Sequence, residues 1–223
     1  MPHIGASEVG DLMNGDFPAV YAKMEGGGRL TEHESAARLA AKLRAVGARP
    51  NEGNLRLAAR IGTALEPIHV QWFEEETGLL VLDQQTVLRL DGYPLRATLD
   101  GRVRLPDQSL VPWEAKTTGA SQRTAELLPR YAPQLQAQML CTGAKVAVLS
   151  ILWRTPKWEA FVVEACAVTQ AELLDRLELF RSFFESATPP PQMPAAVVPA
   201  PIVHSLADYV TRLTTPALEN TDA

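Results

Sequence analysis

The stretch from residue 79 to residue 166 constrains the fold most strongly, because strand-forming segments surround a single helix-forming segment. The strand-forming segments are residues 79–90, 93–105, 109–117, 145–154 and 158–166. Residues 121–142 between them have helical composition, and Asp91-Gly92 is a strong hairpin signal. Helix-forming segments precede and follow this stretch. The order predicts a central mixed β-sheet flanked by helices, which is an α/β or α+β architecture.

Two of the helices expected before the strands lie within residues 32–77. Residues 55–77 repeat apolar side chains at helical spacing, and Gly78 is a natural C-terminal stop. Pro67 lies inside this pattern and is expected to bend the helix or to mark its local start. Residues 32–46 also have helix-forming composition.

The ends of the other helices are predicted from capping residues and prolines. Ser7 is a good N-cap residue for a short helix near the N-terminus, and Thr169 is expected to cap the helix after the last strand. Pro129 and Pro133 are expected to break or bound the pieces of the helix over 121–142.

The chain divides by composition at residue 187. Residues 1–187 have the mixture of apolar and charged residues that is typical of a folded domain, in a chain that is 46% hydrophobic and 21% charged overall. Residues 188–223 begin with a proline-rich stretch, which predicts an extended linker followed by a C-terminal tail.

Several classes of protein are disfavoured. The chain has no apolar run long enough to span a bilayer and no secretory signal, which favours the cytoplasm. Cys141 and Cys166 are isolated and fit no metal-binding spacing. The net charge of −5 argues against a general nucleic-acid coat, although basic residues outnumber acidic ones in 29–60 and 96–130. A local phosphate-binding face is therefore permitted.

The stretch "TLDGRVRLPDQSLVPWEAKTTG" (98–119) contains a compact acidic constellation. Asp100 ends one expected strand, and Glu114 and Lys116 lie two residues apart in the next, so their side chains project from one face. Two carboxylates, the carbonyl of Ala115 and a lysine are the parts required to hold divalent cations and cleave a phosphodiester. Taken alone, the pattern equally fits a surface hairpin with solvated charges.

Four separated segments within residues 4–165 provide context. "IGASEVGDLM" contains Ser7, "RIGTALEPIHVQWFEEETG" contains Gly62 and Glu66, "ATLDG" and "WEAKTT" contain the acidic constellation, and "YAPQLQAQM" follows it. In order and approximate spacing they resemble the YqaJ-like, lambda-exonuclease-like viral recombinases of the PD-(D/E)xK nuclease superfamily. The resemblance implies a restriction-endonuclease-like core.

The resemblance also implies catalytic roles. Asp100, Glu114, the Ala115 carbonyl and Glu66 would hold metal, as two Mg²⁺ ions for which Mn²⁺ could substitute. Lys116 would contact the scissile phosphate or the attacking water. Gln134 would line the cleft and contact the substrate.

Other residues are implied to bind DNA. Ser7 would help to hold a 5′-terminal phosphate, while Tyr131 and Gln138 would lie along the DNA. The family usually has an arginine shortly before this serine, but only Met1, Pro2 and His3 precede Ile4 here. Arg29, Arg56 or Arg60 is the expected substitute.

The function implied by the resemblance is that of an alkaline-exonuclease-type DNase. It would degrade linear double-stranded DNA from 5′ to 3′ and leave 3′ overhangs for a single-strand-annealing recombinase partner. A trimeric ring, and a phage or prophage origin in a bacterial cytoplasm, are implied as well.

Three alternatives remain at this point. A RecB- or Cas4-like nuclease is one, although two cysteines cannot supply the four ligands of an iron–sulfur cluster. A structure-specific endonuclease on the same fold is another, and a non-catalytic DNA-end-binding protein is the third. His69 lies one turn after Glu66 but has no second His–Glu pair, so it is not expected to bind metal.

Overall fold

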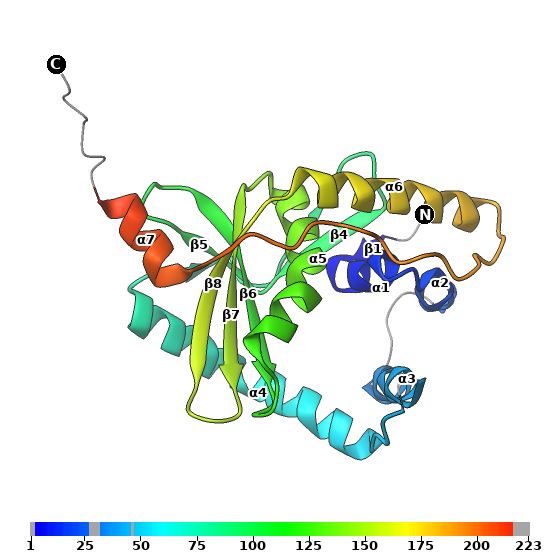
Figure 1. Ribbon diagram of the computed structural model, residues 1–223, viewed down its shortest axis with the longest axis horizontal. Helices are drawn as coiled ribbons and strands as arrows, with labels where there is room; N and C mark the ends of the chain where they lie inside the picture. The colour runs from blue at the N-terminus through cyan, green and yellow to red at the C-terminus, as the bar shows by residue number, and fades with distance from the viewer. Residues whose placement is uncertain (1–2, 27–31, 46, 216–223) are drawn as a thin grey trace.

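The computed structural model describes residues 3–26, 32–45 and 47–215 (Figure 1). Its helices are α1 (Val9–Met13), α2 (Phe17–Glu25), α3 (Glu32–Ala45), α4 (Glu52–Thr77), α5 (Thr124–Thr142), α6 (Ala167–Glu185) and α7 (Leu206–Thr214), with a 3₁₀ turn at Ala6–Glu8. Its strands are β1 (Ile4–Gly5), β2 (Val81–Leu82), β3 (Thr86–Arg89), β4 (Leu95–Leu99), β5 (Gly101–Arg104), β6 (Leu110–Thr118), β7 (Val146–Trp153), β8 (Trp158–Glu164) and β9 (Val203–Ser205). Within the described residues, no helix is long and apolar enough to cross a membrane.

The strands form two sheets where one was predicted. The larger has the order β2-β5-β6-β7-β8-β9, and the smaller has the order β1-β4-β3. Both are mixed, because β6 runs parallel to β7 and β1 runs parallel to β4. The mixed α/β architecture with flanking helices that the sequence predicts is therefore confirmed.

Helices cover both faces of the six-stranded sheet. On one face, α4 and α7 pack over a core that includes Phe73, Trp113 and Val148. On the other face, α5 packs over a core that includes Leu135 and Leu149. Because side chains alternate along β6, its odd-numbered residues from 113 face α4 and its even-numbered residues face α5.

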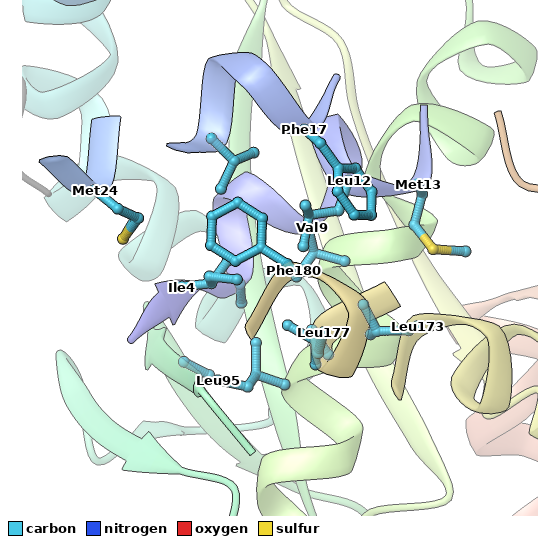
Figure 2. Close-up of a cluster of buried hydrophobic side chains, with 14 of the residues drawn as sticks. Ile4, Val9, Leu12, Met13, Phe17, Met24, Leu95, Leu173, Leu177 and Phe180 are labelled. Atoms are coloured by element: carbon cyan, nitrogen blue, oxygen red, sulfur yellow. The ribbon is translucent and has the colours of Figure 1, made fainter. Parts of the chain in front are cut away.

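A separate core joins the three-stranded sheet to the N-terminal helices and α6 (Figure 2). Leu95 of β4, Phe17 of α2, and Leu177 and Phe180 of α6 are all completely buried there. Burying one such side chain stabilises a protein by about 1.5–3 kcal/mol. This core fixes the 3₁₀ turn that carries Ser7 against the sheet.

Asp100 is the one residue of the chain that separates β4 of the smaller sheet from β5 of the larger sheet. β4 ends at Leu99 in the smaller sheet, and β5 begins at Gly101 in the larger one. A Cβ atom at Gly101 would lie 2.4 Å from Val81 Cγ1, so a larger residue could not occupy this junction without displacement.

The expected strand over 79–90 is divided into β2 and β3, which belong to different sheets. Asp83 (φ 49°) and Gln85 (φ 58°) adopt left-handed backbone conformations in the turn between them. Such conformations are uncommon for residues other than glycine, so the composition gave no signal of this turn.

Two predictions about prolines are corrected. α4 continues through Pro67, and α5 continues through Pro129 and Pro133. Each proline removes one backbone donor, but the remaining hydrogen bonds and the packing of each helix on the sheet keep both helices unbroken.

Two predicted caps are also corrected. Ser7 lies inside the 3₁₀ turn, whose N-cap is Gly5. Thr169 lies inside α6, whose N-cap is Cys166. In both cases the helical backbone begins earlier than the capping residue suggested.

The proline-rich segment, expected to be a linker, packs onto the rest of the protein. The Met193 N–H donates to the Gly15 carbonyl (2.9 Å), and the Ala196 N–H donates to the Met13 carbonyl (2.7 Å). The chain then adds β9 to the edge of the large sheet beside β8. Residues 188–215 therefore contribute side chains to both cores. Figure 1 shows the orange segment running back from the end of α6 to α7.

Candidate active site

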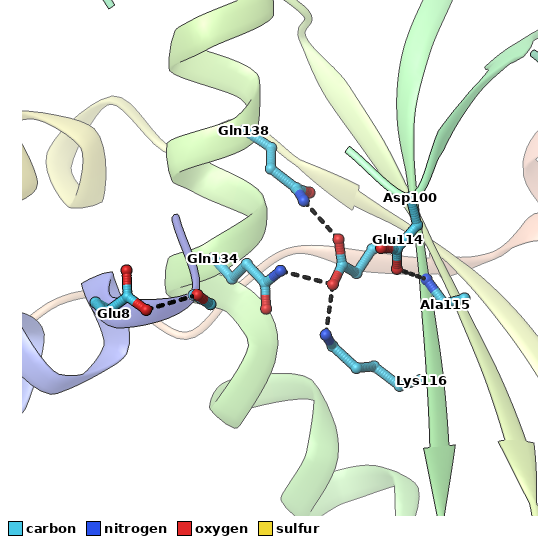
Figure 3. A network of polar contacts seen from close by, with 8 residues as sticks. Glu8, Asp100, Glu114, Ala115, Lys116, Gln134 and Gln138 are labelled. Atoms are coloured by element: carbon cyan, nitrogen blue, oxygen red, sulfur yellow. Dashed lines mark hydrogen bonds and ion pairs between the residues drawn. The ribbon is translucent and has the colours of Figure 1, made fainter. Parts of the chain in front are cut away.

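Glu114 is at the centre of a network of polar contacts between β6 and α5 (Figure 3). Its side chain is only 2% exposed. Oε1 accepts hydrogen bonds from Gln134 Nε2 (2.6 Å) and Lys116 Nζ, and Oε2 accepts one from Gln138 Nε2 (2.5 Å). Three donors therefore compensate a carboxylate that would otherwise be costly to bury.

Asp100 lies beside this network. Its Oδ2 accepts a hydrogen bond from the backbone N–H of Ala115 (2.9 Å). Burial, followed by the charge of Glu114, raises the pKa of Asp100 to about 6. The chain thus concentrates negative charge where the end of β4 lies beside the middle of β6.

Lys116 supplies the positive charge nearest to the two acids. Burial by itself lowers the pKa of Lys116, but the carboxylates of Glu114 and Asp100 outweigh burial and raise it above its ordinary value. The Lys116 ammonium also lies 5.2 Å from the centre of the Tyr131 ring. Lys116 is therefore a fixed cation at neutral pH, held between an acid and an aromatic face.

Glu66 reaches the site from α4. It lines a cavity of about 330 Å³ together with Asp100, Ala115 and the Gln84-Gln85 turn. The side chain of Glu66 is exposed, unlike that of Glu114. Among the residues that the structure describes, no three His, Cys, Asp or Glu side chains converge closely enough to hold a metal ion.

The expected DNA-binding residues are not all at one place. Ser7 is exposed in the 3₁₀ turn, which packs against α5, and Tyr131 is half-buried on α5 beside Lys116. Arg60 is exposed on α4, and Arg56 lies one turn earlier on that helix. Arg29 lies outside the described residues.

Gln138 requires a correction. It was expected along the DNA, but its side chain is completely buried and donates to Glu114. A buried amide cannot contact DNA, so Gln138 holds the carboxylate of Glu114 in place. The helical spacing of Gln134 and Gln138 places both on one face, which is consistent with their shared acceptor.

Lys23 is a cation near Ser7 that the sequence did not indicate. Ser7 Oγ donates to Glu8 Oε1 (3.0 Å), and Lys23 forms an ion pair with the same oxygen. The side chains of Lys23 and Glu8 are 14% and 12% exposed. Because Lys23 comes from α2, only the folded chain brings it beside Ser7.

The chain resembles known proteins in both sequence and structure. The family model for the YqaJ-like viral recombinase domain matches residues 4–145. No curated protein matches the chain.

Three solved structures have a similar fold. The alkaline exonuclease LHK-Exo from Laribacter hongkongensis is 20% identical, with a TM-score of 0.52, over 83% of this chain and 89% of that chain. LHK-Exo in complex with dAMP is 19% identical, with a TM-score of 0.53 and the same coverage of 83% and 89%. A phage-related exonuclease from Haemophilus somnus 129PT is 14% identical, with a TM-score of 0.53, over 83% and 94%.

At these identities the structural likeness shows a shared fold. The family match is independent of it and covers more than half of the chain, including Ser7, Glu66, the acidic constellation and Gln134. This chain belongs to the YqaJ-like viral recombinase family.

Proposed function

We propose that this protein is a metal-dependent exonuclease that degrades linear double-stranded DNA from its 5′ ends and leaves 3′ single strands. The observation that carries this proposal is the arrangement of Asp100, Glu114 and Lys116, in which two acids and a cation meet where β4 ends beside β6. Membership of the YqaJ-like family and the fold shared with exonucleases support it.

The residues present fit a divalent cation that prefers oxygen ligands. Asp100, Glu114, the Ala115 carbonyl and Glu66 offer only oxygen atoms, which suits Mg²⁺ and also Mn²⁺. Burial and then the charge of Glu114 raise the pKa of Asp100, and a bound cation would offset both by favouring the ionised carboxylate. When bound, one or two such ions would polarise the phosphate and activate the attacking water.

The remaining residues have roles that follow from their contacts. Lys116 would place its charge against the non-bridging oxygens of the scissile phosphate, where negative charge develops. Gln138 donates to Glu114 and would hold it in the orientation needed to bind a cation, and the Gln134 amide would hydrogen-bond both Glu114 and the substrate. Tyr131 would line the path of the DNA beside Lys116.

The 5′-terminal phosphate would be held near Ser7. Lys23 is a cation beside Ser7 in the structure, and we infer that its ammonium would bind this phosphate. Arg60, exposed on α4, would contact the DNA backbone farther away.

The biological setting is proposed from the family. The protein would act in the cytoplasm of a bacterial host during phage-type recombination and deliver 3′ strands to a single-strand-annealing partner. A homo-oligomer, such as a three-subunit ring around the DNA, would keep it attached to its substrate.

The deciding experiment follows the two ends of one strand. Linear duplexes labelled at the 5′ or the 3′ end of the same strand are incubated with Mg²⁺ and either wild type or Lys116→Ala. Wild type should release the 5′ label first, while the variant should bind the duplex without digesting it. No digestion by wild type with Mg²⁺ or Mn²⁺ would refute the enzyme, and equal shortening of both ends would refute the polarity.

A further inference from the structure

His69 connects the helix that carries Glu66 to the central strands. It lies one turn after Glu66 on α4, and its ring is only 1% exposed. His69 Nε2 shares a hydrogen bond with Ser150 Oγ of β7 (2.8 Å). Trp158 Nε1 of β8 donates to the same hydroxyl oxygen (2.9 Å). One buried serine hydroxyl therefore joins α4, β7 and β8.

This junction lies directly beside the candidate site. Ser150 is in register with Ala115 on the neighbouring strand β6. Ala115 lines the same cavity as Glu66 and holds Asp100 through its backbone N–H. The His69 ring also meets the Trp113 ring nearly edge-on, with centroids 5.6 Å apart and an angle of 73° between the planes. Ser150, which is hydrogen-bonded to α4, and Ala115, which lines the cavity, are thus neighbours in one sheet.

The local backbone of α4 makes such a hydrogen bond important. Pro67 immediately follows Glu66 and has no N–H, so the helix lacks one internal hydrogen bond at this turn. Elsewhere α4 is held to the large sheet by apolar contacts of Val70 and Phe73 and, two turns after Glu66, by a hydrogen bond from the Val81 N–H to Glu74 Oε1 (2.8 Å). Apolar packing is not directional, whereas a buried hydrogen bond fixes both the rotation and the position of a helix.

Other roles for His69 are inconsistent with its surroundings. Its ring is buried and cannot contact DNA, and burial lowers its pKa to about 4, so it is uncharged near neutral pH. Among the described residues it does not take part in a cluster of groups able to hold a metal ion.

We propose that His69 is a positioning residue that, through its hydrogen bond to Ser150, sets the reach of Glu66 into the cavity shared with Asp100 and Ala115. The inference rests on the proposed function, because it requires Glu66 to take part in holding a cation. It assigns a role to a histidine that the acidic constellation does not include.

The test compares three variants that change this hydrogen bond by different amounts. His69→Leu and Ser150→Ala remove it, whereas His69→Gln keeps an amide that can bond to Ser150. The Mg²⁺ concentration for half-maximal digestion should rise on the order of tenfold in the first two and much less in His69→Gln. The double variant His69→Leu/Ser150→Ala should be little worse than Ser150→Ala alone, because Ser150→Ala already removes this bond together with the one from Trp158 Nε1.

A second readout does not depend on activity. Binding of Mn²⁺ without DNA, followed by electron paramagnetic resonance, should weaken by a similar factor in His69→Leu and Ser150→Ala. The matched control is Gln136→Leu, which removes buried hydrogen bonds to the Glu164 carbonyl (2.8 Å) and from the Cys166 N–H (2.9 Å). Gln136→Leu should lose stability but retain the wild-type metal requirement.

The outcomes separate this inference from the proposed function. The role of His69 would be overturned if wild type digests DNA and Ser150→Ala has an unchanged metal requirement and unchanged Mn²⁺ binding. Wild type that digests no DNA would refute the proposed function instead. If His69→Leu does not fold, Ser150→Ala decides the matter, because it removes only a hydroxyl oxygen. An equal shift in Gln136→Leu would also overturn the inference, because it would attribute the effect to lost stability.

Discussion

The Gln138 amide and the Glu114 carboxylate form a hydrogen bond of 2.5 Å in the interior of the protein, where both side chains are almost completely buried. Gln134 and Lys116 donate to the other oxygen of the same carboxylate. An amide on one oxygen, and an amide with a cation on the other, fix the plane of Glu114. In the metal-binding role that we propose for it, Glu114 would be oriented before a cation or DNA arrives.

Replacing Gln138 by Leu should therefore weaken both folding and activity. The buried Glu114 would lose a donor, which costs about 1–3 kcal/mol of stability. The Mg²⁺ requirement for digestion should rise roughly tenfold or more, as for other residues that orient metal ligands. Urea denaturation and a Mg²⁺ titration of digestion measure the two effects. Gln138→Glu, which sets a second acid against Glu114, should be worse than Gln138→Leu, and the opposite ranking would contradict this account.

The buried His69 should make stability depend on pH. Its pKa is about 4 in the folded protein and near 6.5 when exposed, so the unfolded chain binds a proton first as the pH falls. The contribution of His69 to the free energy of unfolding should be fully present above pH 6.5. It should decrease between pH 6.5 and 4, by up to about 3 kcal/mol. The raised pKa of Asp100 acts in the opposite direction, because protonation favours the folded state.

Urea denaturation at several pH values separates these two groups. In an Asp100→Asn background the opposing contribution is removed, and the loss of stability toward pH 4 should become steeper. Adding His69→Gln to the Asp100→Asn background should make the free energy of unfolding depend less steeply on pH. A slope that does not change on adding His69→Gln would show that other groups govern the pH dependence. Without metal at neutral pH, Asp100→Asn alone should be more stable than wild type.

Lys23 should determine the preference for phosphorylated 5′ ends. If its ammonium binds the terminal phosphate, Lys23→Ala should digest 5′-phosphorylated duplex on the order of tenfold more slowly, the effect of losing one charge-assisted hydrogen bond. Digestion of 5′-hydroxyl duplex should change little. The control is Lys145→Ala, which removes an exposed lysine at the start of β7. Equal loss on both ends would show that Lys23 only supports Glu8 and the 3₁₀ turn.

The centre of the site could be predicted from the sequence, because strand alternation alone places Glu114 and Lys116 on one face. The position of Asp100 between two sheets could not, because it depends on left-handed conformations at Asp83 and Gln85 that composition does not reveal. Lys23 was missed for a different reason. Its partner Glu8 belongs to another helical segment, and only the packing of α2 brings the two together.

The packing of the C-terminal tail, residues 188–215, could not be predicted from composition either. Proline-rich sequence correctly indicates an extended backbone, but it does not indicate whether that backbone packs. Packing here depends on Gly15, which has a φ of +80° and allows the Met193 carbonyl to approach. Nothing in the sequence around Gly15 indicates that its partner is Met193, which lies far along the chain.

Gly15→Ala should therefore detach the tail and destabilise the fold. A Cβ atom at Gly15 would lie 2.0 Å from the Met193 carbonyl oxygen, in a backbone conformation that is already unfavourable for alanine. Gly143→Ala is the matched control, because Gly143 has a φ of +70° but no atom within 4 Å of the added Cβ.

Both variants should lose about 1 kcal/mol from the left-handed conformation, and Gly15→Ala should lose more because of the clash. Thermal unfolding of the two variants measures the difference. A chain ending at residue 187 should be much less stable than the full chain, because it lacks β9 and the buried Leu206. In that shorter chain, Gly15→Ala should cost no more than Gly143→Ala. Equal losses in the full-length chain would mean that the tail yields to the new methyl group without cost.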